Sequence, residues 1–343
     1  MGVSIAVVGA TGAVGQEILR VLEQRRTPVD RIRLFASEKS RGGETTFRGE
    51  RVPLEMLAPG SFRGFDAVLL SAGATVSRTA VPQAISEGAL AIDNSSAFRE
   101  DPDVPLVVPE VNAHRLGEAH GIVANPNCTA AILLMALAPL HRAFGVKRVI
   151  VASYQAVSGK GARAMAECEA QTRDVLAGRP AVPSVFPKPI AFNVLPHVDL
   201  FESDGRTREE IKVERETRKI LEHPTLALDA TCVRVPVLRC HSEAVTVELE
   251  RPCSPEEARD LWRRSPGVTV VDEPARNGYP TPLDAEGGDD VLVGRVRRAT
   301  VFERGLSFWC VGDQLRKGAA LNAVQILEHA IPKSVAAASP AIR

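Results

Sequence analysis

Short apolar segments alternate with helical patterns over the first third of the chain. Val3–Val8 is an apolar, β-branched run of the kind found in a buried parallel strand. Similar runs follow at residues 31–36, 66–71 and 90–93. Apolar residues at helical spacing predict helices over residues 16–25 and about 75–87. Strands that alternate with helices predict an α/β fold with a doubly wound parallel sheet, whose ligands bind at the carboxyl ends of the strands.

The pattern changes after the segment Asn125-Pro-Asn-Cys128. An Ala- and Leu-rich segment predicts a helix over residues 129–144, and a charged one predicts a helix over 208–222. The strands of a mixed sheet are predicted at residues 149–154, 231–236, 244–249, 291–297 and 306–311. We therefore expect a second, α+β domain after the parallel sheet.

The end of the chain is expected to rejoin the first domain. The last helix, residues 317–329, is predicted to pack on it, and the small, polar tail 334–343 is expected to fray. The first domain is thus predicted to contain residues 1–127 and 316–343, and the second residues 128–315. A length of 343 residues agrees with two domains of ordinary size.

Charge and cysteine usage exclude several classes of protein. The 42 Lys and Arg residues balance 42 Asp and Glu residues, which argues against a partner such as nucleic acid. The six cysteines show neither CxxC pairs nor zinc-finger spacing with histidine, so no metal site is predicted. The N-terminus lacks the features of a signal peptide, and no apolar run is long enough to span a membrane. We expect a cytoplasmic protein that binds no membrane.

A glycine turn joins the first strand to the first helix. Gly9-Ala-Thr-Gly12-Ala-Val-Gly15 lies where backbone N–H groups and the helix dipole favour a pyrophosphate. The spacing is GxxGxxG rather than GxGxxG, and a tight turn without a ligand is the alternative. We predict a dinucleotide site that includes Gly9, Thr11, Gly12, Ala13, Val14 and Gly15.

The residues after the second strand favour NADP over NAD. NAD sites place an acidic residue at this position, whereas a 2′-phosphate requires cations and hydroxyl groups. No acidic residue closes the strand, and the loop that follows supplies Ser37, Lys39, Ser40 and Arg41. Glu38 lies among them and is expected to point outward; a solvated loop is the alternative.

Cys128 is the candidate nucleophile. It opens a helix directly after Asn-Pro-Asn, where unpaired N–H groups and the helix dipole favour a thiolate and can hold an oxyanion. Two later residues suit such chemistry. Arg234 offers a planar cation for a carboxylate, and His241 offers a proton donor and acceptor near neutral pH. Each of the three could instead be structural.

These segments together resemble the aspartate-semialdehyde dehydrogenase family, from residue 3 to about residue 330. The resemblance rests on residues 9–15, 93–99 (DNSSAFR), 107–112 (VVPEVN), 125–128 (NPNC), 154–159 (YQAVSG), 192–197 (FNVLPH), 209–212 (EEIK) and 232–242 (CVRVPVLRCHS). The last segment is the most specific. The glycine turn is shared with many reductases.

The resemblance implies a Rossmann-type NADP domain, a catalytic and dimerisation domain with a mixed sheet, and a homodimer or a dimer of dimers. It implies the NADPH-dependent reduction of L-4-aspartyl phosphate to aspartate 4-semialdehyde, through a thioester, on the route to lysine, threonine, methionine and diaminopimelate. Cys128 would be the nucleophile, His241 the acid in this direction and the base in the reverse one, and Gln155 would orient the acyl intermediate.

The resemblance also implies binding roles. Arg234 would bind the substrate carboxylate, Glu210 its amino group, and Arg99 and Lys212 the phosphate. Asn127 would help to position the reacting centre. The nicotinamide end of the cofactor site would be lined by Gly73, Ser158, Gly159 and Asn322.

Two residues depart from the family pattern, and two other functions compete. Lys160 and Thr129 stand where a small residue and Ser are expected; Lys160 could contact the cofactor phosphates or be solvated. N-acetyl-γ-glutamyl-phosphate reductase also combines a Rossmann turn with Cys and His, but lacks the Cys-x-Arg-x(6)-His segment. A dinucleotide-binding protein without catalysis would bind the cofactor but show no thiol-dependent turnover.

Overall fold

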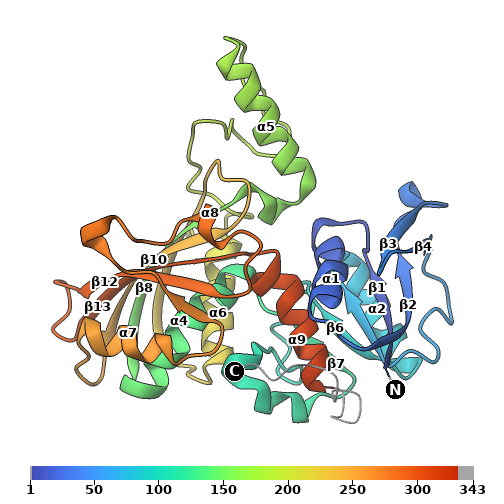
Figure 1. The fold of residues 1–343 in the computed structure, drawn as a ribbon, viewed down its shortest axis with the longest axis horizontal. Helices are drawn as coiled ribbons and strands as arrows, with labels where there is room; N and C mark the ends of the chain where they lie inside the picture. Colours follow the sequence, from blue (N-terminus) through green and yellow to red (C-terminus); the bar gives the residue numbers. More distant parts are fainter. Residues whose placement is uncertain (1, 331–343) are drawn as a thin grey trace. The chain divides into compact units, whose positions relative to one another are not determined.

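The chain forms two compact units in the computed structural model, which describes residues 2–330 (Figure 1). Of the described residues, unit 1 contains 2–127 and 319–330, and unit 2 contains 128–318. The tail at 334–343, for which fraying was expected, lies outside the described residues. Within residues 2–330 no helix is both long and apolar enough to cross a membrane.

Unit 1 is built on a seven-stranded sheet with β1 near its centre. The strand order is β3 (Glu44–Phe47), β4 (Glu50–Glu55), β2 (Val29–Phe35), β1 (Val3–Val8), β5 (Ala67–Leu70), β6 (Leu90–Asp93) and β7 (Ile122–Ala124). Only the β3–β4 pair is antiparallel. The chain winds outward from β1 in both directions, which confirms the predicted doubly wound sheet.

Helices α1 (Ala13–Gln24) and α2 (Ala74–Ser86) connect these parallel strands. Helix α9 (Leu321–Ala330) returns from the end of the chain and packs against α1, β6 and the short helix α3 (Pro109–Asn112). Its buried apolar residues join the core of unit 1 with those of α1 and the central strands. Helix α9 therefore belongs to unit 1, the domain on which the sequence analysis expected the last helix to pack.

Unit 2 contains a six-stranded mixed sheet, as predicted. Its order is β11 (Val268–Val270), β12 (Val291–Arg298), β13 (Gly305–Gly312), β10 (His241–Leu249), β8 (Val146–Gln155) and β9 (Ala227–Arg234). Helices α4 (Cys128–Phe144), α6 (Arg208–Ile220) and α7 (Pro255–Arg263) pack against it. Helix α5 (Ala162–Leu176) projects from the unit, and the short α8 (Pro282–Ala285) lies beside β13 (Figure 1).

Strand β8 separates the two faces of this sheet. Its buried residues Val149, Val151, Ser153 and Gln155 alternate with Ile150 and Tyr154, which are 49% and 39% exposed. The buried side chains point to the face where α4 packs, because strand side chains alternate between faces. The other face carries an aromatic pair, Tyr154 and Trp309, with ring centroids 5.3 Å apart.

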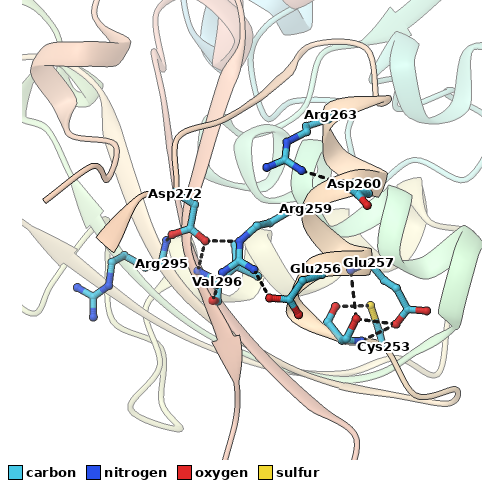
Figure 2. Close-up of polar contacts among 10 residues, drawn as sticks. Cys253, Glu256, Glu257, Arg259, Asp260, Arg263, Asp272, Arg295 and Val296 are labelled. Carbon is cyan, nitrogen blue, oxygen red and sulfur yellow. Dashed lines mark hydrogen bonds and ion pairs between the residues drawn. The ribbon is translucent and has the colours of Figure 1, made fainter. Parts of the chain in front are cut away.

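A buried carboxylate fixes the bulge in β12 (Figure 2). The side chain of Asp272 is fully buried and accepts hydrogen bonds from the N–H groups of Arg295 (2.7 Å) and Val296 (3.2 Å). Arg259 of α7 donates to Asp272 (2.7 Å) and to the Val296 carbonyl (3.0 Å). These bonds attach α7 to the irregular part of the strand.

The structure also contains elements that the hydrophobic pattern did not predict. They include the β3–β4 hairpin, β7, β11 and the helices α3, α5, α7 and α8. The hairpin lies at the edge of its sheet, is mostly polar and has Pro53 in β4, so it lacks the apolar run of a central strand. Helix α1 begins at Ala13, three residues before the predicted start, because the glycine turn itself leads into the helix.

Candidate active site

Cys128 is the first residue of α4 and is partly exposed, whereas residues 129–138 of the helix are buried. Cys128 is therefore the accessible residue at the start of a helix whose next ten residues are buried. A Cβ on Gly318 would lie 2.7 Å from the Cβ of Cys128, so only glycine fits against the cysteine there. The sequence interpretation did not include Gly318, because its contact with Cys128 joins positions 190 residues apart.

The sheet register brings Gln155, Arg234 and His241 together. Gln155 of β8 pairs with Arg234 of β9, and the antiparallel pairing of Ser242 with Tyr154 places His241 opposite Gln155. All three side chains are buried on the face covered by α4. Gln155 Nε2 also donates to Thr129 Oγ1, the residue after the candidate nucleophile, at 2.8 Å.

The side chains of Arg234 and His241 both lie against the backbone of Gly159. Nη1 of Arg234 donates to the Ala156 carbonyl at 2.6 Å. A Cβ on Gly159 would lie 2.9 Å from this Nη1 and 3.2 Å from the His241 ring. Any side chain at position 159 would therefore displace the Arg234 guanidinium or the His241 ring. Burial lowers the pKa of Arg234, and the charges of Glu209 and Cys128 oppose this effect.

The hydrogen bonds of His241 define its tautomer. Nδ1 accepts from the Ala156 N–H at 3.1 Å, so the proton of the neutral ring is on Nε2. Nε2 is buried and has no hydrogen-bond partner among the described residues. Burial, with the charge of Arg234, lowers the pKa of His241 well below its ordinary value. The ring is thus neutral at pH 7 and presents Nε2–H as a donor. In this state the ring is a hydrogen-bond donor, whereas the expected acid role would require the imidazolium and the expected base role an unprotonated Nε2.

Glu209, not Glu210, faces these residues. Glu209 Oε1 lies 3.3 Å from Gln155 Nε2, and Oε2 lies 3.6 Å from Lys212 Nζ. Both oxygens of Glu210 accept backbone N–H groups instead, from Thr207 at 2.7 Å and Cys232 at 2.9 Å. The role expected for Glu210 is corrected accordingly. The sequence Thr207-x-x-Glu210 is a capping box, and Glu209 shares a helix face with Lys212 three residues later, so both signals were present.

The two expected phosphate ligands belong to different units. Lys212 in unit 2 forms ion pairs with Asp199 and Glu209. Arg99 in unit 1 is buried and donates to the carbonyls of Asn125 (2.8 Å) and Asn94 (2.7 Å). Arg99 therefore braces the segment that leads through the buried Asn127 to Cys128. Their joint role in phosphate binding stays a prediction.

The glycine turn in unit 1 fits a dinucleotide. Gly9 has φ +85°, and a Cβ on Gly15 would lie 2.2 Å from the Gly9 carbonyl, so this tight turn requires glycine. Thr11 and Gly12 are exposed, and Ala13, Val14 and Gly15 form the first turn of α1. The N–H groups of a first helical turn have no partner within the helix and favour a phosphate.

The expected 2′-phosphate residues lie at the same edge of the sheet. The N–H groups of Gly9 and Ala10 donate to the carbonyl of Phe35, the last residue of β2. Ser37 follows, and residues 38–40 form a short 3₁₀ helix. Ser37, Lys39 and Arg41 are exposed and Ser40 is half-buried, so the loop presents both cations to solvent next to the turn.

The residues expected to line the nicotinamide end of the cofactor site differ in how far they are already engaged by other parts of the protein. Gly73 follows β5, and a Cβ there would meet no atom within 4 Å. Ser158 is buried and accepts a hydrogen bond from Gln314, a residue that the sequence interpretation did not include. Asn322 is fully buried, and its amide donates to Val107 O (2.8 Å) and Asn125 Oδ1 (2.6 Å). Because both amide hydrogens are used, Asn322 is a support for the segment before Cys128.

Lys160 was expected either to contact the cofactor phosphates or to be solvated, and it has a further contact within the protein. Its side chain is exposed, and its ammonium lies 5.5 Å from the ring centroid of Phe186. Phe186 belongs to a small core with Val157 and residues of α5. Lys160 therefore attaches the Gly159 loop to that core through a cation–π contact.

A buried acid lies one row beneath His241 on the same face of β10. Glu243 pairs across the sheet with Cys310, whose Sγ lies 3.6 Å from Glu243 Oε2. The other carboxyl oxygen of Glu243, Oε1, has no hydrogen-bond partner among the described residues. Burial raises the pKa of Glu243 well above its ordinary value of 4.5. The folded protein therefore keeps a proton that the unfolded chain releases above this pH.

We predict from this that Glu243 destabilises the fold as the pH rises. Glu243→Gln removes the ionisable group, so the variant's free energy of unfolding should exceed that of the wild type by a margin that grows as the pH rises above 4.5. Urea denaturation at several pH values measures this margin. Glu256→Gln, at an exposed site, is the control, and a margin that is independent of pH would contradict the prediction.

Comparisons with known proteins agree with this arrangement. Residues 4–119 match a family model described as the NAD binding domain of semialdehyde dehydrogenase, and residues 137–317 match its dimerisation domain. The first match confirms the predicted dinucleotide-binding domain. Within residues 2–330, no cluster of three or more His, Cys, Asp or Glu side chains could hold a metal ion.

Similar proteins carry one name. The aspartate-semialdehyde dehydrogenase of Aquifex aeolicus is 50% identical over 333 residues, which are 96% of this chain and 98% of the relative. That of Bacillus subtilis is 44% identical, over 95% and 97% of the two chains. A crystal structure of aspartate semialdehyde dehydrogenase II from Vibrio cholerae, complexed with ASA, is 42% identical with a TM-score of 0.93, over 96% and 98%. The chain belongs to the aspartate-semialdehyde dehydrogenase family, as its sequence motifs predict.

Proposed function

We propose that this enzyme reduces L-4-aspartyl phosphate to L-aspartate 4-semialdehyde and phosphate with NADPH, as a step of amino-acid biosynthesis. The observation that carries the proposal is that Arg234 and Glu209 both lie next to Gln155, which also binds Thr129 in the helix that Cys128 begins. A guanidinium suits the α-carboxylate and a carboxylate suits the α-ammonium of one amino acid. The Vibrio cholerae relative is described as complexed with ASA, which supports the same substrate here.

Cys128 begins the proposed reaction. Its thiolate attacks the acyl carbon, and the carbonyl π electrons move to the oxygen, which becomes an oxyanion. The Nε2–H of His241 donates a hydrogen bond to this oxygen, because no described residue accepts a hydrogen bond from Nε2. When the oxyanion collapses, the bond to the phosphate oxygen breaks and a thioester remains on Cys128. Arg99 and Lys212 are the proposed ligands of the departing phosphate.

The second half uses the same groups. NADPH, when bound, supplies the hydride that reduces the thioester carbon. Nε2–H of His241 again holds the oxygen, and the amide of Gln155 orients the acyl group beside Thr129. Collapse re-forms the carbonyl and returns the electron pair to sulfur, which regenerates the Cys128 thiolate. His241 completes this sequence without passing through an imidazolium, in agreement with its lowered pKa. The cytoplasmic location expected from the sequence is part of this proposal, because a reducing compartment keeps a cysteine nucleophile reduced.

The two neighbouring glutamates provide a direct test of the amino-group ligand. Glu209→Gln removes the charge that faces Gln155 and Lys212, so we expect KM for aspartate semialdehyde to rise about tenfold or more. Glu210→Gln weakens the capping box, so we expect a lower melting temperature with a much smaller change in KM. Steady-state kinetics and thermal denaturation of both variants measure the two effects. A larger KM effect in Glu210→Gln would refute the role of Glu209.

The choice of NADP over NAD depends, in this proposal, on the loop after β2. Replacing Lys39 and Arg41 together with alanine removes both exposed cations. Each is expected to contribute about 1 kcal/mol or more through the 2′-phosphate, so KM for NADP should rise at least tenfold while KM for NAD changes little. An equal rise for both cofactors would remove these residues from the 2′-phosphate site.

The proposed oligomer is a homodimer through the mixed sheet of unit 2, whose family model is a dimerisation domain. The face that carries Ile150, Tyr154 and Trp309 offers apolar and aromatic side chains, as a stable interface requires. A dimer of dimers is the larger assembly that the family resemblance implies. Sedimentation of the purified protein distinguishes the two.

A spectrophotometric assay tests the whole proposal. The purified enzyme with aspartate semialdehyde, NADP and phosphate should form NADPH, and omission of phosphate should stop the reaction. Activity only on N-acetylglutamate semialdehyde would favour N-acetyl-γ-glutamyl-phosphate reductase. Cofactor binding with no turnover of either aldehyde would favour the non-catalytic alternative.

A further inference from the structure

The backbone just before His241 adopts an unusual conformation. Cys240 is fully buried and has φ +74°, in the left-handed region that residues with a Cβ rarely enter. Such a residue persists only where its surroundings hold it, and these conformations gather at functional sites. Because Cys240 is bonded directly to His241, its backbone angles set the direction in which the imidazole leaves the chain.

The side chain of Gln314 binds the backbone of Cys240 directly. Gln314, buried in the turn after β13, accepts the Cys240 N–H through Oε1 at 2.7 Å. The adjacent Asp313 binds Nε of Arg239 at 2.7 Å and the Gly287 N–H at 2.8 Å, which anchors the same turn to the residue before Cys240. The turn at 313–314 therefore forms hydrogen bonds with Arg239 and Cys240, the two residues before His241.

The other end of the Gln314 amide reaches the opposite wall of the histidine site. Its Nε2 donates to Ser158 Oγ. Ser158 lies between Ala156, whose N–H binds Nδ1 of His241, and Gly159, whose Cα faces the ring. Gln314 thus links the segment that carries the imidazole to the loop that encloses it. Within the described part of the chain, neither the Cys240 backbone N–H nor the Ser158 hydroxyl forms another hydrogen bond.

We propose that Gln314 is a positioning residue for catalysis: it keeps Cys240 left-handed and so directs Nε2–H of His241 toward the oxygen of the reacting acyl group. This inference rests on the proposed function. Gln314 contacts His241 only through Cys240 and the Ser158 loop. It should therefore act on kcat more than on the binding of aspartate semialdehyde, whose proposed ligands are Arg234 and Glu209.

The test uses the different freedom of glycine and alanine at position 240. Gln314→Leu removes both hydrogen bonds and is expected to lower kcat between about tenfold and a hundredfold, because a displacement of the imidazole by ~1 Å costs that much. Glycine adopts φ +74° without strain, whereas alanine does not. Cys240→Gly and Cys240→Ala both delete the thiol, so they form a matched pair, each measured alone and combined with Gln314→Leu.

We expect Gln314→Leu/Cys240→Gly to recover most of the kcat of Cys240→Gly, and Gln314→Leu/Cys240→Ala to recover none. KM for aspartate semialdehyde should change by less than about threefold in these variants. Gln314→Glu keeps an acceptor for the Cys240 N–H and should retain most of the activity; it serves as the test if the leucine variant does not fold. Equal recovery by glycine and alanine, or wild-type kcat in Gln314→Leu, would overturn the proposal.

A second readout separates this inference from the proposed reaction. The ¹⁵N chemical shifts of the His241 ring, assigned by their loss in His241→Asn, report its tautomer and hydrogen bonds without any turnover. They should change in Gln314→Leu and return in Gln314→Leu/Cys240→Gly. An inactive wild-type enzyme would refute the proposed function alone, whereas unchanged shifts in Gln314→Leu would refute the positioning role.

Discussion

Cys128→Ala is expected to lower kcat for aspartate semialdehyde by about 10⁴-fold or more, because it removes the only group that forms the proposed thioester. Cys128 is a partly exposed residue at the start of α4, and its replacement deletes a single sulfur. The dinucleotide site predicted in unit 1 does not include it. The dissociation constant for NADPH, measured by fluorescence titration, should therefore stay within about twofold of the wild type.

A second cysteine controls for the loss of a thiol as such. Cys253 is buried beside α7, where its Sγ contacts the Ser254 carbonyl at 3.4 Å, and it has no part in the proposed chemistry. Cys253→Ala should keep the wild-type kcat. Turnover by Cys128→Ala at a rate close to that of Cys253→Ala would refute covalent catalysis at Cys128.

His241→Ala is expected to have the second largest effect, a loss of about 10²–10⁴-fold in kcat. The structure gives the ring one free donor, Nε2–H, and keeps it neutral through burial and the charge of Arg234. His241→Asn also offers an N–H donor but cannot reproduce the imidazole. It should therefore lose less activity than the alanine variant, which has no donor at all.

The pH dependence of the wild-type enzyme distinguishes this donor role from proton transfer. The pKa of His241 is lowered well below 6.5, so the ring stays neutral as the pH falls through 6.5, and kcat should not decline there with its titration. The same shift makes the unfolded chain the stronger proton binder below this pH, so His241 reduces stability on acidification. A kcat that falls with an apparent pKa near 6.5 and loses this limb in His241→Asn would contradict a neutral donor.

Local sequence signals were enough for the framework of the nucleotide-binding unit. The apolar run Val3–Val8, the glycine turn and the helix after it all lie within 22 residues, and the structure has them in the same order. The hairpin of β3 and β4 was missed because its strands are polar and lie at an edge, where hydrophobic burial leaves little pattern.

The glutamates on α6 show where local signals in the sequence were not used. Thr207-x-x-Glu210 predicts a cap, and the spacing from Glu209 to Lys212 predicts a shared helix face. Both signals were in the sequence. The family resemblance alone led to Glu210, whereas the contacts of each carboxylate select Glu209.

The sequence by itself determined the strand, glycine turn and helix at the start of the chain, the change from a parallel to a mixed sheet, and the position of Cys128 at a helix start, because each depends on neighbours within a few residues. Tertiary structure alone decided which distant groups meet. The register of three strands joins Gln155, Arg234 and His241, and a turn 73 residues after His241 supplies Gln314 to the backbone before it. It also selected the tautomer of His241, because a ring's proton is placed by the partner of its other nitrogen, and that partner, Ala156, is 85 residues away in the sequence.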